Sequence, residues 1–224
     1  MALILNIETA SPVCSVCLAK DEALIDFRED KTGNSHAKIL TVFIDELFKN
    51  NNIPIGELDA VAVSSGPGSY TGLRIGVSVA KGLCYALNKP LIAVPTLQAL
   101  ANGIRQKQKV ESSFLMPVMD ARRMDIYTAI YDFELKEIRK TDCATVNVEF
   151  ENSLKAFEKI IIGGNAAEKC RPILASEKFS FTENYCDSRS MIHISFEKYM
   201  KQRFEDLVYF EPFYLKEFPV KKAN

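Results

Sequence analysis

The chain has 224 residues, of which 47% are hydrophobic and 25% charged, and its formal net charge is −1. This length allows one or two domains with substantial cores. A pI near 6.2 argues against a protein that binds RNA by itself through a wide basic face. No apolar run approaches the roughly 18 residues of a membrane span, and the short apolar start lacks the basic flank of a secretion signal. We therefore expect a cytoplasmic protein without a membrane partner.

The six cysteines do not indicate a metal site or a disulfide framework. Only Cys14 and Cys17 are spaced as a CxxC pair, and they fall in a predicted strand, where an odd spacing sends them to opposite faces. We expect all six to be reduced, and we expect no metal and no cofactor.

The opening of the chain predicts a three-stranded meander over residues 2–8, 13–19 and 23–27, because apolar runs alternate with polar turns. A helix follows to about residue 50, with Asn34 or Ser35 as its cap. Its apolar arc is broad for a helix that covers one face of a sheet. Either the whole arc is core, or one edge of it meets a second protein.

A strand, a Gly/Pro/Ser turn and a helix are predicted over residues 60–76. Gly66 and Gly68 allow a tight loop that leaves amides pointing outward at a helix start, where an anion would fit. A Walker loop is excluded because no lysine occurs between Gly66 and Lys81. A dinucleotide fingerprint is excluded because residues 60–110 contain no Asp or Glu. A turn that only packs the helix closely remains the alternative.

The helix predicted over residues 70–87 carries small residues at every fourth position, namely Gly72, Gly76 and Ala80. Glycine inside a helix costs up to ~1 kcal/mol relative to alanine, so two of them need a structural reason. We expect the close approach of another helix, either the preceding helix of this chain or a helix of a second subunit.

The remaining chain predicts a strand over 91–94, a helix over 96–103 and a charged boundary at 105–113. We therefore expect one lobe over residues 1–108 and a second over 109–224. The strand pattern then restarts, which suggests a duplication, and Asp120, Arg122 and Arg123 follow a strand end. A strand ending before Gly163 and Gly164, a helix over 190–203 and a packed tail at 212–216 complete the prediction.

Three segments together resemble the TsaB (YeaZ) family. They are Ser-Gly-Pro-Gly-Ser-Tyr-Thr-Gly-Leu-Arg-Ile-Gly at 65–76, Ile-Leu-Asn-Ile-Glu-Thr-Ala at 4–10, and Asp-Ala-Arg-Arg at 120–123 with Tyr127. The resemblance implies a two-lobed α/β protein of the actin-like, ribonuclease-H-like (ASKHA) fold with mixed sheets. It also implies a non-catalytic scaffold that binds TsaD in threonylcarbamoyladenosine synthesis on tRNA, with TsaE as a further partner.

In this family the two helices near 35–50 and 70–87 pair with TsaD, or with a second copy in a homodimer, and tRNA is met only through the complex. The interface residues expected here are Ile39, Phe43, Leu47, Gly72, Gly76 and Ala80. TsaD carries a metal-binding His-x-x-x-His pair where this chain has Thr96 and Leu100, and leucine cannot ligate a metal. We therefore expect no catalytic residue.

A nucleotide-dependent ATPase or kinase of the actin and sugar-kinase superfamily is the alternative function. Its first turn normally contains glycine, whereas residues 8–12 here read Glu-Thr-Ala-Ser-Pro. A weak nucleotide or anion cleft would involve Glu8, Gly66, Gly68, Arg74, Gly163 and Gly164. A metalloprotease has no support, because the chain lacks a His-Glu-x-x-His motif.

Overall fold

The computed structural model describes residues 1–33, 36–108 and 112–216. Its first sheet is built around β1 (Leu3–Glu8), which pairs antiparallel with β2 (Cys14–Lys20) and parallel with β4 (Ala60–Ser64). The edges are β3 (Ala23–Asp30) and β5 (Leu91–Val94), in the order β3-β2-β1-β4-β5. Strands β1, β4 and β5 are buried at every position, as expected for apolar strands covered on both faces.

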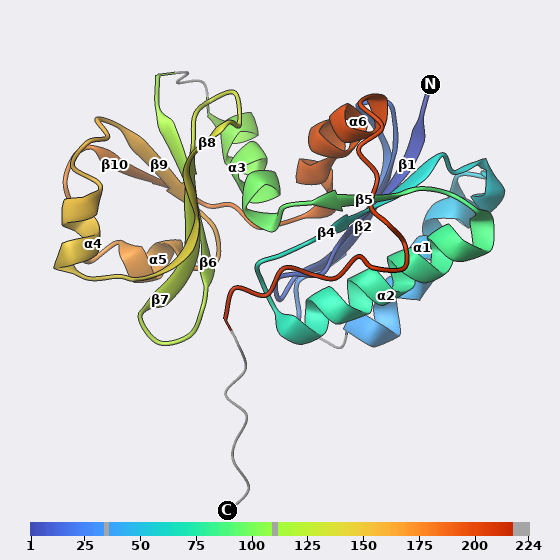
Figure 1. Cartoon of the computed structure of the whole chain (residues 1–224), viewed down its shortest axis with the longest axis horizontal. Coiled ribbons are helices and arrows are strands. Elements are labelled where there is room, and N and C mark those ends of the chain that lie inside the picture. Colours follow the sequence, from blue (N-terminus) through green and yellow to red (C-terminus); the bar gives the residue numbers. More distant parts are fainter. Residues whose placement is uncertain (34–35, 109–111, 217–224) are drawn as a thin grey trace, which may run out of the picture.

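Two helices, α1 (His36–Asn50) and α2 (Tyr70–Leu87), lie side by side against one face of this sheet (Figure 1). The Ser69 hydroxyl caps α2 by accepting the amide of Gly72 at 3.2 Å, and Asn88 ends the helix in the left-handed conformation. A short 3-10 turn, η1 (Ile55–Glu57), precedes β4. The expected caps of α1, Asn34 and Ser35, lie outside the described residues.

The second sheet repeats the topology of the first. It contains β6 (Phe114–Asp120), β7 (Asp125–Tyr131), β8 (Glu137–Thr145), β9 (Ile160–Gly163) and β10 (Phe179–Thr182). The order β8-β7-β6-β9-β10 matches β3-β2-β1-β4-β5 strand for strand, with the same parallel and antiparallel pairings. The expectation of a repeated pattern is confirmed at the level of topology.

Helix α3 (Thr96–Lys107) lies between the two sheets and packs against β6 and β9 (Figure 1). The chain returns to the first sheet through η2 (Ser188–Met191) and α6 (Ile192–Met200), which contacts β5 and β1. One hydrophobic cluster therefore joins both lobes and includes Ile4, Ile92, Leu100, Leu115 and Met191. A division at 108/109 separates the two sheets but leaves α3 and α6 each packed against the sheet of the other lobe.

Two elements escaped the sequence-based prediction. Helix α4 (Val148–Ser153) begins where a strand was expected to end, because the Asn147 side chain accepts the Phe150 amide at 2.8 Å and caps it. Strand β10 is short and only its first residue is buried, so it carries almost no pattern. Helix α5 (Ala167–Cys170) covers the second sheet together with α4.

Cys14 and Cys17 lie on opposite faces of β2, as expected.

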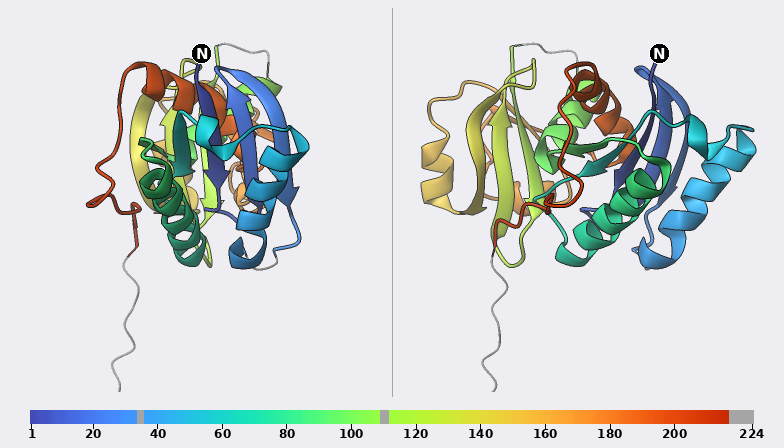
Figure 2. Two further views of the ribbon diagram at one scale, coloured as in Figure 1. Left: turned by 90° about the vertical axis from the view of Figure 1, so that its right-hand side faces the viewer. Right: turned by 45° about the vertical axis from the view of Figure 1, so that its right-hand side comes forward.

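After α6 the chain runs past the start of α2 toward the second sheet (Figure 2). The Phe213 amide donates to the Ser65 carbonyl at 2.7 Å, and the Lys81 ammonium donates to the carbonyls of Val208 and Phe210. The expected packing of residues 212–216 on the body is therefore confirmed. Among the helices of the described ranges, none is both long and apolar enough to span a bilayer.

Candidate partner interface and interlobe cleft

Three amides of the loop between β4 and α2 donate hydrogen bonds within the chain. The amide of Gly66 donates to the Thr96 hydroxyl at 3.0 Å, and that of Ser69 donates to the Ala10 carbonyl at 2.7 Å. The Ser65 amide donates to Val94, and Gly66, at φ +106°, faces the carbonyl of Phe213 so closely that a Cβ would collide with it. These contacts favour the tight-turn alternative over an anion-binding loop.

Two glycines of α2, Gly72 and Gly76, pack against the β1–β2 turn. A Cβ on Gly72 would collide with the carbonyl of Thr9, and one on Gly76 would collide with the Thr9 hydroxyl. Ala80 is also fully buried within the chain. For Gly72 and Gly76 the expected approach of a neighbouring helix was wrong, because Thr9 already occupies the space beside them.

The helices nevertheless present an accessible surface on their other side. On α2, Ser78 and Gly82 are exposed, and a Cβ on Gly82 would meet no atom within 4 Å. On α1, the Val42 side chain is 50% exposed, which is high for a valine in a helix that packs on a sheet. We define the α1–α2 outer face as a set of apolar and small residues of both helices that are not buried, namely Ile39, Val42, Phe43, Ile75, Ser78, Val79 and Gly82.

Of the six expected interface residues, only Ile39 and Phe43 belong to this outer face. Leu47 is fully buried in the core under α1, and Gly72, Gly76 and Ala80 are buried on α2. Ser78 and Gly82, which were not among the expected residues, repeat the four-residue spacing on the opposite side of the same helix. The spacing of small residues is the same on both sides of α2, so spacing alone does not show which side is exposed.

The residues expected to form one nucleotide cleft do not come together. Glu8 is buried, where its carboxylate accepts the Ala10 amide at 2.6 Å and the Cys186 thiol at 3.2 Å. Burial raises the pKa of Glu8 to about 7. The backbones of Gly163 and Gly164 pack closely against Ile104 and Leu100 of α3. Thus only Gly68, among the six expected residues, lines the cavity between the lobes.

That cavity has a volume of about 560 Å³ and lies between turns of both lobes. The first lobe contributes the β1–β2 turn and the start of α2, and the second contributes the β6–β7 turn. Tyr214, Leu215 and Lys216 of the tail also line it, so part of the space where the two lobes face each other is taken by the chain itself. Arg74 lies outside the lining, with its guanidinium 4.2 Å from the ring centre of Tyr70.

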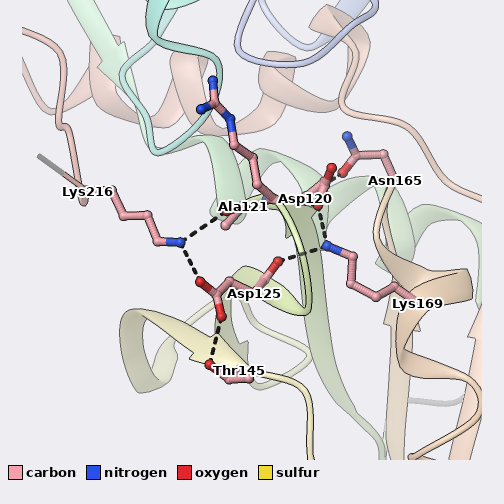
Figure 3. A network of polar contacts seen from close by, with 8 residues as sticks. Asp120, Ala121, Asp125, Thr145, Asn165, Lys169 and Lys216 are labelled. Atoms are coloured by element: carbon pink, nitrogen blue, oxygen red, sulfur yellow. Dashed lines mark hydrogen bonds and ion pairs between the residues drawn. The ribbon is translucent and has the colours of Figure 1, made fainter. Parts of the chain in front are cut away.

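Two lysines neutralise the carboxylates of the β6–β7 turn (Figure 3). Lys169 pairs with Asp120, and the Lys216 ammonium lies 2.6 Å from Asp125. The hydrogen bond from Lys216 lowers the pKa of Asp125, and Thr145 lowers it further. This pairing attaches the tail to the second lobe.

The described residues hold no group of three His, Cys, Asp or Glu side chains that could bind a metal. Thr96 donates and accepts within the β4–α2 loop region, and Leu100 is fully buried in the shared core. Both histidines make other contacts, since a ring nitrogen of His36 lies 2.9 Å from the Ser11 carbonyl and one of His193 lies 3.2 Å from the Glu22 carboxylate.

Comparison with known proteins places these features in a family. The model of the family described as "TsaD: tRNA N6-adenosine threonylcarbamoyltransferase" matches residues 30–220. The tRNA threonylcarbamoyladenosine biosynthesis protein TsaB of Buchnera aphidicola subsp. Schizaphis graminum is 30% identical over 72% of this chain and 78% of that protein. The chain belongs to the TsaB family, within the group that the TsaD model describes. TsaB of Buchnera aphidicola subsp. Baizongia pistaciae is 26% identical over 96% of this chain and 98% of its own length.

Solved structures confirm the fold. YeaZ from Pseudomonas aeruginosa superposes with a TM-score of 0.81 at 21% identity, over 96% of this chain and 100% of that chain. The inorganic polyphosphate/ATP-glucomannokinase of Arthrobacter sp. strain KM superposes with a TM-score of 0.54 at 12% identity, over 90% and 100%. The expected two-lobed ASKHA fold with mixed sheets is therefore correct.

Proposed function

We propose that this chain is a non-catalytic TsaB subunit that binds TsaD through the α1–α2 outer face and supports threonylcarbamoyl transfer to adenosine of tRNA. The family membership supplies the process. The observation that carries the mode of binding is the accessible apolar and small surface of two adjacent helices, with Val42 half exposed and Gly82 open. Small residues let a second pair of helices approach closely, and half-buried aliphatic residues around them supply apolar area.

The same face would pair two copies of this chain when TsaD is absent, and TsaE would join the assembled complex. The reaction would take place in the cytoplasm, where tRNA is modified. No catalytic residue is assigned to this chain, because the interlobe cavity is partly filled by its own tail and the position of the TsaD histidines is occupied by Thr96 and Leu100.

Size-exclusion chromatography with light scattering tests this proposal on the chain alone and mixed with TsaD from the same cell. We expect a homodimer that converts to a mixed complex. Gly82→Leu should abolish both assemblies, since leucine fills the approach surface at a position where an added Cβ meets no atom of the chain within 4 Å. Gly56→Leu is the matched control, because Gly56 is equally open but lies in η1. A monomer that ignores TsaD would refute the proposal, and pairing by the Gly82 variant would refute the surface.

A further inference from the structure

At the mouth of the interlobe cavity lie two arginines whose positive charge no acidic side chain in the described part of the chain neutralises. Arg122 and Arg123 line it at the tip of the β6–β7 turn, and both are exposed. The two carboxylates of that turn are already paired, Asp120 with Lys169 and Asp125 with Lys216 (Figure 3). Within residues 1–33, 36–108 and 112–216, no ion pair joins either guanidinium to an acidic side chain. The two arginines are therefore available to an external anion.

The turn holds these arginines in an unusual conformation. Both have positive φ, 72° for Arg122 and 48° for Arg123, a region that costs a non-glycine residue of order 1 kcal/mol or more. Hydrogen bonds fix the turn, because the Arg122 amide donates to the Asp120 carboxylate at 3.1 Å and its carbonyl accepts the Asp125 amide at 3.0 Å. Two adjacent guanidinium groups are thus presented from a rigid turn at one rim of the cavity.

Aromatic side chains form much of the rest of the mouth. Tyr127 lies on the arginine side, while Tyr70 and Tyr214 lie opposite with ring centres 4.8 Å apart. Arg74 covers the outer side of Tyr70 and extends the positive charge onto α2. Guanidinium forks match phosphate oxygens, and aromatic surfaces accept bases of any sequence.

We propose that this mouth, defined by Arg122, Arg123, Tyr70, Tyr127 and Tyr214, binds the phosphodiester backbone of the RNA substrate in the assembled complex. The inference rests on the proposed function, which brings tRNA to the complex. A net charge of −1 makes binding by the isolated chain weak, so the contact adds to those of the partner. Tyr70 and Thr71 at the start of α2 line the cavity. The mouth is therefore next to the N-terminal end of a helix that also contributes to the α1–α2 outer face.

The test is fluorescence anisotropy of labelled, unmodified tRNA with the complex of this chain and TsaD, over a series of KCl concentrations. Each neutralised phosphate contact contributes about 0.7 to the salt slope for single strands and about 0.9 for a duplex. We expect Arg122→Gln and Arg123→Gln each to weaken binding several-fold near 0.1 M salt and to lower the slope by about one contact. Lys140→Gln on β8, which also removes one exposed positive charge, should leave both unchanged.

Size-exclusion chromatography of each mixture distinguishes a failure of complex assembly from a loss of RNA binding by an intact complex. Failure of the wild-type chain to assemble would overturn the proposed function and this inference with it. The double variant carries both Arg122→Gln and Arg123→Gln. If its complex with TsaD stays intact and binds tRNA with the affinity and salt slope of the wild type, the inference alone is overturned. Micromolar binding of ATP by the isolated chain, lost in the double variant while tRNA binding is kept, would assign the mouth to a free nucleotide and also overturn it.

Discussion

The carboxyl group of Glu8 on β1 accepts a hydrogen bond from the thiol of Cys186, 178 residues later in the chain, with Sγ and Oε2 3.2 Å apart. Cys186 lies in the segment that returns from the second sheet to the first, and its Sγ also lies 3.8 Å from the carbonyl of Thr96, where the chain first leaves. Cys186 therefore links the buried acid on β1 to the start of α3. Burial has the largest effect on the pKa of Glu8 and raises it, hydrogen bonds from the Ala10 amide and the Cys186 thiol lower it, and the nearby Asp187 raises it.

This burial predicts a pH-dependent stability. The pKa of Glu8 rises from 4.5 to about 7 because burial penalises the charged form, so the folded state binds the proton more tightly than the unfolded chain. Its contribution is complete below pH 4.5 and is lost as the pH rises through 7, an effect of order 3 kcal/mol. We expect Glu8→Gln to reduce the fall in unfolding free energy between pH 5 and 8, measured by urea denaturation. Identical pH profiles for both proteins would contradict it.

Gly72 and Gly82 lie on opposite sides of α2, and we expect opposite effects on stability from replacing each with alanine. Gly72→Ala places a methyl group against the Thr9 carbonyl, and overpacking of this kind typically costs about 1–3 kcal/mol of stability. Gly82→Ala meets no atom within 4 Å and should gain up to ~1 kcal/mol from helix propensity. Urea denaturation of both variants measures the difference. Equal effects would mean that Thr9 does not limit the inner side of α2.

The ion pair between Lys216 and Asp125 should help to hold the tail against the second lobe. Lys216→Met removes the hydrogen bond that lowers the pKa of Asp125, so this pKa should rise toward its ordinary value in an NMR titration of the carboxyl carbon. The Phe213 amide, which donates to the Ser65 carbonyl, should then exchange faster with solvent because the end of the tail is released from the second lobe. Lys140→Met is the control. Unchanged exchange at Phe213 would show that Tyr214 and the Ser65 bond hold the tail without the ion pair.

Local signals in the sequence predict the two long helices, the repeated order of elements and every strand except β10, while helix α4 also went unpredicted. Continuous apolar runs such as β4 exist because those strands are buried on both faces, and Ser69 starts α2 because its hydroxyl caps the Gly72 amide. These signals are local, so they are legible without the fold. The motif at residues 65–76 was specific enough to indicate the family, which the comparisons then showed.

Only the tertiary structure decided which residues face outward and which groups meet. Gly72 and Gly82 are the same residue type in one helix, yet the first packs on Thr9 and the second is open, because burial depends on a turn 63 residues earlier in the chain than Gly72. Glu8 and the Gly163–Gly164 turn looked like parts of one cleft, but α3 and the returning segment fill the space between them. Contacts between residues far apart in sequence leave no periodic trace, so they had to be seen in the folded chain.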